Sequence, residues 1–279
     1  MNLFARAPGK VNLCLYVGEP REDGLHPLVS VVQALSLADD LTLEPADGAA
    51  DEVVCPGVEG PNLAGRALAL FREATGWDAP PQRLTIDKRI PVAAGMGGGS
   101  SDAAATLRLA SHASGLPIPP ELGPRLRADV PSLICPGRVL MTGAGEHVDR
   151  LTAPGPLGVL VLPVDAALST PDVYREADRL GLTRSHAELA ELDARVRADP
   201  GAVHNDLQDA ARSLCPKIDA ALDFATAAGA DHALVSGSGP TVVGLFIEQP
   251  ARAEEGAEGW PRGFAAEPVD EEWARVVPA

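Results

Sequence analysis

A glycine-rich segment followed by two serines is the part of this sequence whose residue types and spacing could do chemistry on a phosphate. Four glycines precede Ser100 and Ser101, and an alanine-rich stretch that predicts a helix follows them. Glycines permit positive φ and let the backbone approach a ligand, while N–H groups at a helix start attract an anion. The two hydroxyls could serve phosphate oxygens or a magnesium ion. We therefore predict a phosphate-binding segment made of Pro91, Val92, Ala93, Ala94, Gly95, Met96, Gly97, Gly98, Gly99, Ser100 and Ser101.

The spacing within this segment excludes three common nucleotide-binding motifs. No lysine follows the glycines, as a GxxxxGK[ST] P-loop requires. Counted from Gly95, the last glycine of a GxGxxG fingerprint falls on Ser100, and no HRD or DFG element of the protein kinases is present. The plain alternative, a flexible loop with a serine helix cap, stays open at this point.

The apolar pattern predicts the elements that position this segment. Leu84–Ile86 predicts a short strand before it, and Ser101–Ser114 predicts a helix after it. Residues 62–76 predict another helix, which Gly76 can end. Residues 1–46 predict a β-rich region, with apolar runs around 11–17, 29–37 and 41–43.

A second half is expected after a stretch rich in proline and glycine, Thr152–Gly158, which predicts a domain boundary. Helices and strands are mixed without the regular alternation of a doubly wound sheet, which favours an α+β fold. We predict two domains, 1–153 and 154–279. In the second we expect a strand at Val159–Pro163, helices near 171–180, 185–198 and 205–229, strands at Ala233–Ser236 and Thr241–Phe246, and an exposed polar loop at 249–262.

Composition favours a cytoplasmic globular protein. Twenty-three basic and thirty-nine acidic residues give a net charge of −16, which disfavours nonspecific binding to nucleic acid or to an anionic membrane. No segment has the roughly 18 consecutive apolar residues of a transmembrane helix, and the N-terminus lacks the pattern of a signal peptide. The four cysteines lie far apart, which predicts reduced thiols rather than a zinc site or a disulfide framework.

Several segments, in the right order, resemble the GHMP kinases (galactokinase, homoserine kinase, mevalonate kinase and phosphomevalonate kinase). The segment PVAAGMGGGSSDAAA resembles the central motif of that family. Its continuation SSDAA is similar to the same motif in the branch that phosphorylates a cytidylated methylerythritol. The resemblance spans roughly residues 4–246. Its other blocks are APGKVNLCLYV, REDGLHPLVSVVQAL, NLAGRALALFRE, ADVPSLICPGRVLMTGAGE, STPDVY, HNDLQ and VSGSGPTVVGLF.

The resemblance implies a fold, a reaction and a ligand. It implies a ribosomal-protein-S5-like domain over 1–153 and a ferredoxin-like domain over 154–279, with ATP between them. The expected reaction is ATP-dependent phosphorylation of the 2-hydroxyl of 4-diphosphocytidyl-2-C-methyl-D-erythritol, in non-mevalonate isoprenoid precursor biosynthesis. ATP is expected with Mg²⁺, but no carboxylate cage for the metal is visible. The expected partner is the small-molecule substrate, without nucleic acid or membrane, and the chain is expected as a monomer or homodimer.

The resemblance also assigns a catalytic pair. Lys10, in APGKVN, and Asp129, in ADVP, match the family's catalytic lysine and aspartate. Asp129 would accept or orient the hydroxyl proton, while Lys10 would keep Asp129 ionised and stabilise charge on the transferring phosphoryl group. Without the resemblance, Asp129 would be interpreted as a surface or helix-end carboxylate and Lys10 as a strand lysine with an exposed end.

Ligand-binding residues follow in the same way. Asn62 matches a position near the adenine, with a helix N-cap as the alternative, and Lys88 could contact the nucleotide, with an exposed lysine as the alternative. His26 matches a histidine that hydrogen-bonds the cytosine, but Leu25 stands where the family has a tyrosine. The remaining predicted acceptor-side residues are Asn12, Tyr174, Gly237 and Ser238.

Two alternative functions stay open. Leu25 leaves room for a GHMP kinase that acts on another small alcohol or phosphate acceptor. A catalytically idle, ligand-binding relative is the alternative from a different class, although such a sensor would have no need for Lys10, Asp129 and the glycine-rich segment together.

Overall fold

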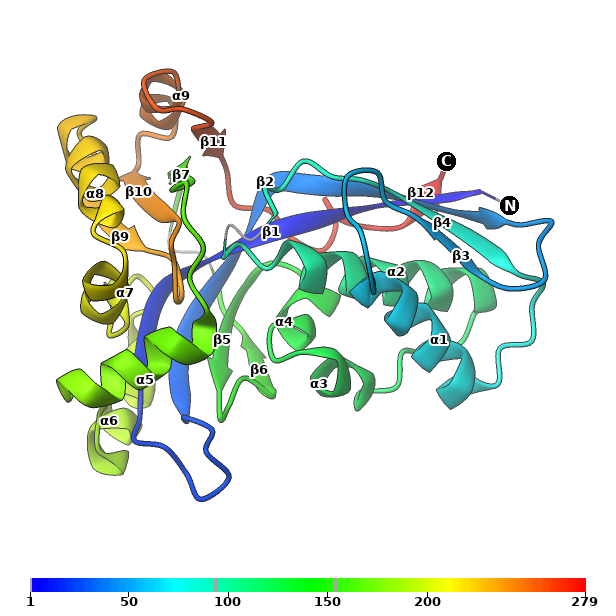
Figure 1. Cartoon of the computed structure of the whole chain (residues 1–279), viewed down its shortest axis with the longest axis horizontal. Helices are drawn as coiled ribbons and strands as arrows, with labels where there is room; N and C mark the ends of the chain where they lie inside the picture. Colours follow the sequence, from blue (N-terminus) through cyan, green and yellow to red (C-terminus); the bar gives the residue numbers. More distant parts are fainter. Residues whose placement is uncertain (1, 93–94, 153–154) are drawn as a thin grey trace.

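The computed structural model describes residues 2–92, 95–152 and 155–279 and contains two sheets with their covering helices (Figure 1). The first sheet is built from β1 (Leu3–Val17), β2 (Leu28–Pro45), β3 (Glu52–Val54), β4 (Gln82–Asp87), β5 (Arg138–Thr142), β6 (His147–Arg150), β8 (His204–Asn205) and β12 (Val277–Pro278). The second contains β7 (Leu157–Leu162), β9 (His232–Val235), β10 (Val242–Ile247) and β11 (Phe264–Ala266).

The helices fall into two groups. Below the first sheet in Figure 1 lie α1 (Leu63–Thr75), α2 (Gly98–Ser114), α3 (Leu122–Leu126) and α4 (Val130–Ile134). The second group contains α5 (Thr170–Leu180), α6 (His186–Ala198), α7 (Gln208–Leu214), α8 (Lys217–Ala227) and α9 (Ala251–Ala257). None of the helices in the described ranges is both long and apolar enough to cross a membrane.

The long antiparallel pair of β1 and β2 forms the frame of the molecule. The first sheet has the order β12-β1-β2-β4-β3, and β5 pairs with the far end of β2. Almost every residue of β1 after Arg6 is buried, because helices cover one face of this sheet and the second sheet packs near the other. The second sheet has the order β11-β7-β10-β9.

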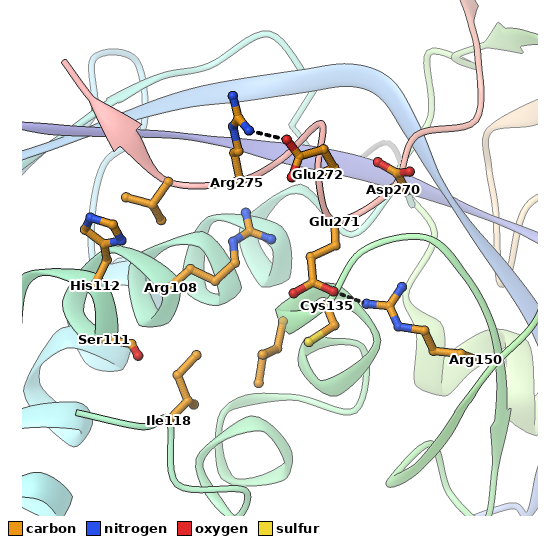
Figure 2. Close-up of a pocket in the computed structure, with 12 residues that line it drawn as sticks. Arg108, Ser111, His112, Ile118, Cys135, Arg150, Asp270, Glu271, Glu272 and Arg275 are labelled. Atoms are coloured by element: carbon orange, nitrogen blue, oxygen red, sulfur yellow. Dashed lines mark hydrogen bonds and ion pairs between the residues drawn. The ribbon is translucent and has the colours of Figure 1, made fainter. Parts of the chain in front are cut away.

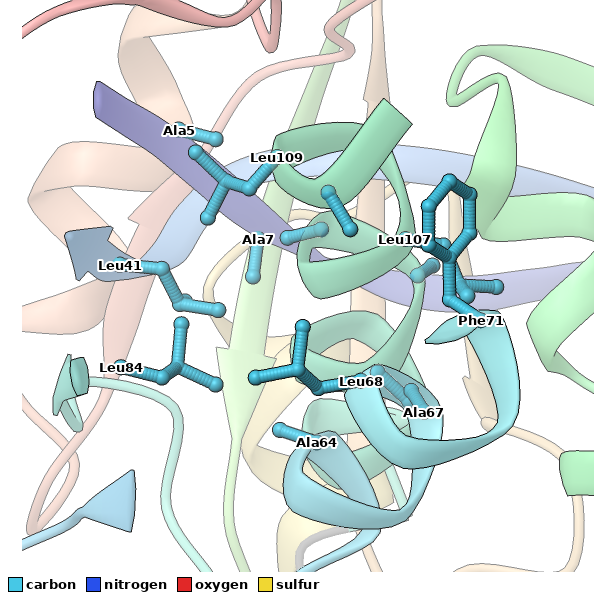
Figure 3. Close-up of a cluster of buried hydrophobic side chains, with 14 of the residues drawn as sticks. Ala5, Ala7, Leu41, Ala64, Ala67, Leu68, Phe71, Leu84, Leu107 and Leu109 are labelled. Carbon is cyan, nitrogen blue, oxygen red and sulfur yellow. The ribbon is translucent and has the colours of Figure 1, made fainter. Parts of the chain in front are cut away.

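Three large apolar clusters among the described residues hold these layers together. One joins the first sheet to α1 and α2 and includes Leu41, Leu84, Leu68 and Phe71 (Figure 3). A second cluster lies between the sheets, with Val11 and Leu35 from the first and Val159 and Val243 from the second. A third lies between the second sheet and its helices. The predicted α+β class and the main helices and strands are confirmed.

Three boundaries differ from the prediction. The helix expected from Ser101 begins at Gly98, so the last glycines of the segment form its first turn. The single helix expected near 205–229 is two helices, α7 and α8, with Pro216 at the start of the second. The loop expected at 249–262 is wrong in part, because α9 forms there and Ala253 is buried against the second sheet.

The C-terminal residues return to the first sheet. Val277 pairs with Phe4 on β1, and Pro268 forms a bridge with Leu35 on β2. The predicted domain boundary, between residues 153 and 154, lies outside the described residues and stays a prediction. All four cysteines are free thiols.

Candidate active site

The glycine-rich segment lies at the start of α2, where its backbone is turned by glycines at positive φ. Gly97 is the N-cap of α2, with φ +68°, and no side chain caps the helix. Gly95, with φ +71°, approaches a second turn so closely that a Cβ would lie 2.7 Å from the carbonyl oxygen of Gly239. These positions therefore require glycine for close approach as well as for conformation. The predicted residues Ala93 and Ala94 lie outside the described residues.

Lys10 lies on β1 directly beneath this segment. Its backbone N–H donates to the carbonyl oxygen of Met96 (2.9 Å), and its side chain is 6 % exposed. Its Nζ donates to Oδ1 of Asn12 (2.8 Å) and lies 3.8 Å from Oδ2 of Asp129. The structure thus brings the predicted catalytic pair together with Asn12, and the interpretation of Lys10 as a strand lysine with an exposed end is wrong.

Asp129 lies at the N-terminus of the short helix α4. It is the N-cap residue, and Pro131 occupies the first turn, as is common at a helix start. Its side chain is 38 % exposed, so its carboxylate is accessible to a ligand while one oxygen faces Lys10. An accessible carboxylate beside a buried ammonium group can accept or orient a hydroxyl proton.

The second turn, around Gly237, closes over Lys10 and Asn12 from the other sheet. A Cβ on Gly237 would lie 3.1 Å from Oδ1 of Asn12 and 3.5 Å from Nζ of Lys10. Oγ of Ser236 accepts the backbone N–H of Asn12 (3.2 Å). The structure therefore brings Gly237 and Asn12 together, whereas the hydroxyl of Ser238 is hydrogen-bonded to that of Thr170 (2.9 Å) at the start of α5. Their predicted contact with the acceptor stays a prediction.

Asn205 positions this second turn, and we did not predict it as a site residue. Its Nδ2 donates to the carbonyl oxygens of Val235 (2.7 Å) and Gly237 (2.8 Å). Asn205 is buried, and its Oδ1 accepts the N–H of Leu207. The segment HNDLQ, one of the blocks of family resemblance, was the available signal for it.

His26 and Tyr174 lie together on the acceptor side. Their ring centroids are 5.0 Å apart at an angle of 51°, and Nε2 of His26 lies 2.9 Å from Oδ1 of Asp178. Burial, with the charge of Asp129 adding to it, raises the pKa of Tyr174 to about 12, so its hydroxyl stays protonated at neutral pH. Leu25 is 52 % exposed beside them. The geometry fits a surface that could receive a planar ring.

Lys88 is enclosed by two buried carboxylates. Its Nζ donates to Oδ2 of Asp39 (2.5 Å) and to Oδ2 of Asp102 (2.8 Å), so the interpretation of an exposed lysine is wrong. Oδ1 of Asp39 accepts the N–H groups of Arg89 (2.6 Å) and Ile90 (2.8 Å). Burial works to lower the pKa of Lys88, but the two carboxylates outweigh it and raise the pKa. Its predicted nucleotide contact stays a prediction.

Asp102, in α2, accepts fewer hydrogen bonds through its carboxylate than Asp39 does. Burial, its largest influence, raises the pKa of Asp102 to about 7, with Lys88 opposing and Asp39 adding to that rise. Its Oδ1 is buried and has no hydrogen-bond partner among the described residues.

Asn62 caps α1, because its Oδ1 accepts a hydrogen bond from the backbone N–H of Ala64 (2.9 Å), as its alternative interpretation predicted.

The segment fits the phosphates of a nucleotide. The first N–H groups of α2 have no acceptor within the helix, and a Cβ on Gly99 would meet nothing within 4 Å. The hydroxyl of Ser101 donates to the carbonyl oxygen of Pro8 (2.7 Å), so Ser100 is the hydroxyl left for a ligand. The described residues contain no group of three or more His, Cys, Asp or Glu that could hold a metal ion.

Comparisons with known proteins identify the family of this chain. Residues 62–130 match the N-terminal domain of GHMP kinases, and residues 181–266 match their C-terminal domain. The chain is 40 % identical over 260 residues to the 4-diphosphocytidyl-2-C-methyl-D-erythritol kinase of Nocardioides sp., covering 86 % of this chain and 87 % of that protein. The same enzyme of Streptomyces coelicolor is 40 % identical over 283 residues, with coverage of 93 % and 92 %.

A solved structure extends the comparison to the fold. The crystal structure of a 4-(cytidine 5'-diphospho)-2C-methyl-D-erythritol kinase matches with a TM-score of 0.79 at 33 % identity, covering 95 % of this chain and 98 % of that one. Homoserine kinase from Cytophaga hutchinsonii matches with a TM-score of 0.69 at 17 % identity, which shows a shared fold alone. The chain therefore belongs to the GHMP kinases and, within them, to the 4-diphosphocytidyl-2-C-methyl-D-erythritol kinase family.

Proposed function

We propose that this chain transfers the γ-phosphoryl group of ATP to the 2-hydroxyl of 4-diphosphocytidyl-2-C-methyl-D-erythritol, giving the 2-phosphate and ADP in the non-mevalonate route to isoprenoid precursors. The observation that carries this proposal is the meeting of Lys10, Asp129 and the glycine-rich segment. Lys10 connects these parts. Its backbone N–H donates to Met96, a Cβ on Gly97 would lie 3.0 Å from its Cγ, and its Nζ lies 3.8 Å from Asp129.

Each part has a role in moving a phosphoryl group. The N–H groups at the start of α2 and the Ser100 hydroxyl hold the phosphates, since a helix start favours an anion. Asn12 fixes the ammonium of Lys10 through its Oδ1, and Ser30 fixes Asn12 in turn (Nδ2 to Oγ, 2.8 Å). Asp129 orients or deprotonates the acceptor hydroxyl, while Lys10 stabilises charge on the phosphoryl group. Magnesium bound with ATP would neutralise phosphate charge, and no protein ligand is assigned to it.

His26 and Tyr174 support the choice of acceptor. His26 has one ring nitrogen engaged by Asp178, which leaves the other nitrogen for a base edge, and Tyr174 offers a ring face beside it. The charge of Asp129 adds to the rise in the pKa of Tyr174 that burial causes, which supports one site for a bound base and the reacting hydroxyl. A monomeric or homodimeric state and a cytoplasmic location stay predictions.

Leu25 favours a second candidate function, in which the acceptor is another small alcohol or phosphate. The side chain at this position is exposed but aliphatic, so it offers no aromatic face for stacking on cytosine. His26 and Tyr174 are present in either case. The two candidates therefore differ in what fills the space next to Leu25.

The decisive experiment measures ATP consumption with a panel of acceptors that includes the cytidylated methylerythritol, mevalonate and homoserine. We expect turnover with the first alone. Turnover only with mevalonate or homoserine would show that the proposed acceptor is wrong. No turnover with any acceptor would favour a catalytically idle, ligand-binding relative.

Asp129→Asn tests the mechanism. We expect kcat to fall about 10²- to 10⁴-fold while ATP binding persists, because a positioned acid–base group contributes on that scale. Asp223→Asn is the matched control, since Asp223 is exposed on α8, and it should retain normal kinetics. A near-normal kcat for Asp129→Asn would contradict the proposed role of Asp129 in orienting or deprotonating the acceptor hydroxyl.

A further inference from the structure

A cavity of about 650 Å³ lies away from the candidate active site, between α2, the end of α4 and the C-terminal segment 270–276 (Figure 2). Its volume is within the range of small-molecule sites. Cys135, which follows α4, lines this cavity, whereas Asp129 precedes the same helix and faces Lys10. The two sites therefore lie at opposite ends of α4 and share none of the residues assigned above.

Arg108 is the side chain that distinguishes this cavity. It projects from α2 toward the C-terminal segment (Figure 2) and donates to the carbonyl oxygens of Leu133 (3.1 Å) and Arg6 (2.6 Å). Its Nε is buried without a hydrogen-bond partner among the described residues. Burial lowers the pKa of Arg108 to about 10, so the guanidinium group stays charged at neutral pH. None of its bonds within the described residues is to a carboxylate.

Two ion pairs lie around the cavity besides Arg108. NH2 of Arg150 donates to Oε2 of Glu271 (2.5 Å), and Arg275 is paired with Glu272 (Figure 2). Oδ1 of Asp270 accepts the N–H of Trp273 (3.1 Å). Asp270 has no ion pair among the described residues, so Arg108 is the one cation of the lining without a carboxylate partner and Asp270 the one carboxylate without a cation.

His112 and three aliphatic residues complete the lining. His112 lies one turn after Arg108 on the same face of α2 and is exposed. Ile118, Ile134 and Val276 supply apolar surface. A cation without a carboxylate partner beside apolar walls fits a molecule with an anionic head and a short hydrocarbon body.

We propose that this cavity is a second binding site, which takes a small organic anion, a phosphate monoester or a carboxylate on a short aliphatic chain, with the head on Arg108 and the chain against Ile118, Ile134 and Val276. The ligand would be held by a charge-assisted hydrogen bond to the guanidinium group and by burial of its hydrocarbon part. Reactivity of the neighbouring Cys135 reports occupancy without any use of kinase activity.

The test follows alkylation of Cys135 by iodoacetamide, measured by peptide mass spectrometry in the intact protein. Cys135 is exposed, whereas Cys14 and Cys215 are buried. Butyl phosphate or pentanoate should slow this alkylation several-fold and saturably at constant ionic strength. Inorganic phosphate and butanol should protect less, because each lacks one half of the proposed ligand. The two anions tested separately distinguish a phosphate head from a carboxylate head.

Two variants locate the effect. Arg108→Gln removes the charge, and His112→Glu places a carboxylate one turn away to pair with Arg108; each should reduce the protection at least several-fold. Because His112 is exposed, its variant should fold even if Arg108→Gln does not, and thermal melting checks both. His186→Glu, an exposed substitution of the same kind on α6, should leave protection intact.

The opposite results overturn the proposal. No protection by butyl phosphate or pentanoate, or equal protection in the His112→Glu protein, would exclude an anion site on Arg108. Neither result depends on ATP or an acceptor, so failure here is distinct from failure of the proposed kinase activity.

Discussion

Lys10 and Lys88 lie against neighbouring glycines of the glycine-rich segment, and both have largely buried side chains beside carboxylates, but their partners differ. Lys10 has one neutral partner, Asn12, and a partly exposed carboxylate at 3.8 Å. Lys88 donates to two buried carboxylates at 2.5 and 2.8 Å. The charge of Lys10 is therefore available to a ligand, whereas the charge of Lys88 is neutralised by ion pairs within the protein.

The difference separates a chemical role from a structural one. Gly97 contacts the side chain of Lys10, and Gly98 lies against Nζ of Lys88, so the two lysines support adjacent residues of the same turn. Asp39 also accepts two N–H groups of the chain that enters the segment. Lys88 and its carboxylates thus hold the segment in place, while Lys10 has the place that the proposed mechanism requires, beside Asp129.

Replacing each lysine by methionine should give opposite phenotypes. Lys10→Met should lower kcat about 10²- to 10⁴-fold with a small change in stability, because it removes charge stabilisation at the phosphoryl group. Lys88→Met should lower the free energy of unfolding by about 3–5 kcal/mol, because two buried carboxylates lose their cation. Urea unfolding and steady-state kinetics on both proteins measure the split. If Lys88→Met instead raised the KM for ATP at normal stability, the predicted nucleotide contact would be favoured.

Gly97→Ala and Gly76→Ala form a matched pair that tests the contact between the turn and Lys10. Both glycines have left-handed backbones, with φ of +68° and +70°, so each substitution should cost about 1–2 kcal/mol of stability. A Cβ on Gly97 would lie 3.0 Å from Cγ of Lys10, whereas one on Gly76 would meet nothing within 4 Å. We therefore expect only Gly97→Ala to lower kcat. Equal kinetics in the two variants would show that the Lys10 contact is dispensable.

Asp102 should make the Lys88 region sensitive to pH. Its pKa is raised from 3.8 to about 7 in the folded protein, so between these values the folded state retains a proton that the unfolded state has lost. Its contribution to stability therefore falls as pH rises through this window and is constant above it. Asp102→Asn should become more stable relative to the parent protein as pH rises, by at most about 1.4 kcal/mol per unit. Urea unfolding at several pH values measures this, and parallel curves for the two proteins would contradict it.

Leu25→Tyr tests the acceptor side and has the smallest expected effect. A new aromatic face beside His26 should tighten binding of the cytidylated substrate about 2- to 10-fold, the range of one aromatic stacking contact. Leu214→Tyr, at an exposed position on α7, is the control. Inhibition by a cytidine nucleotide measures the change; unchanged affinity would place the base elsewhere.

The local pattern was sufficient for the main elements. Asn62 and Gly76 delimit α1 because a side-chain cap and a left-handed glycine act on the nearest turn. The apolar runs predicted β1 and β2, since a strand buried on both faces has a nearly continuous apolar sequence. The motif blocks supplied the site residues, and the structure brings Lys10, Asn12 and Asp129 to one place.

The sequence by itself therefore determined the family and the main elements, and it predicted the phosphate-binding segment, because each motif and each element is encoded by residues close together in the chain. Only the tertiary structure decided which charges remain available. Asp39 and Asp102 reach Lys88 from 49 and 14 residues away, and the return of the C-terminal segment past α2 creates the cavity at Arg108. The tertiary structure also decided that part of the polar stretch 249–262 forms α9, because Ala253 packs against a core built from distant strands. Pairing and burial between distant segments leave no local period, so only the folded chain reveals them.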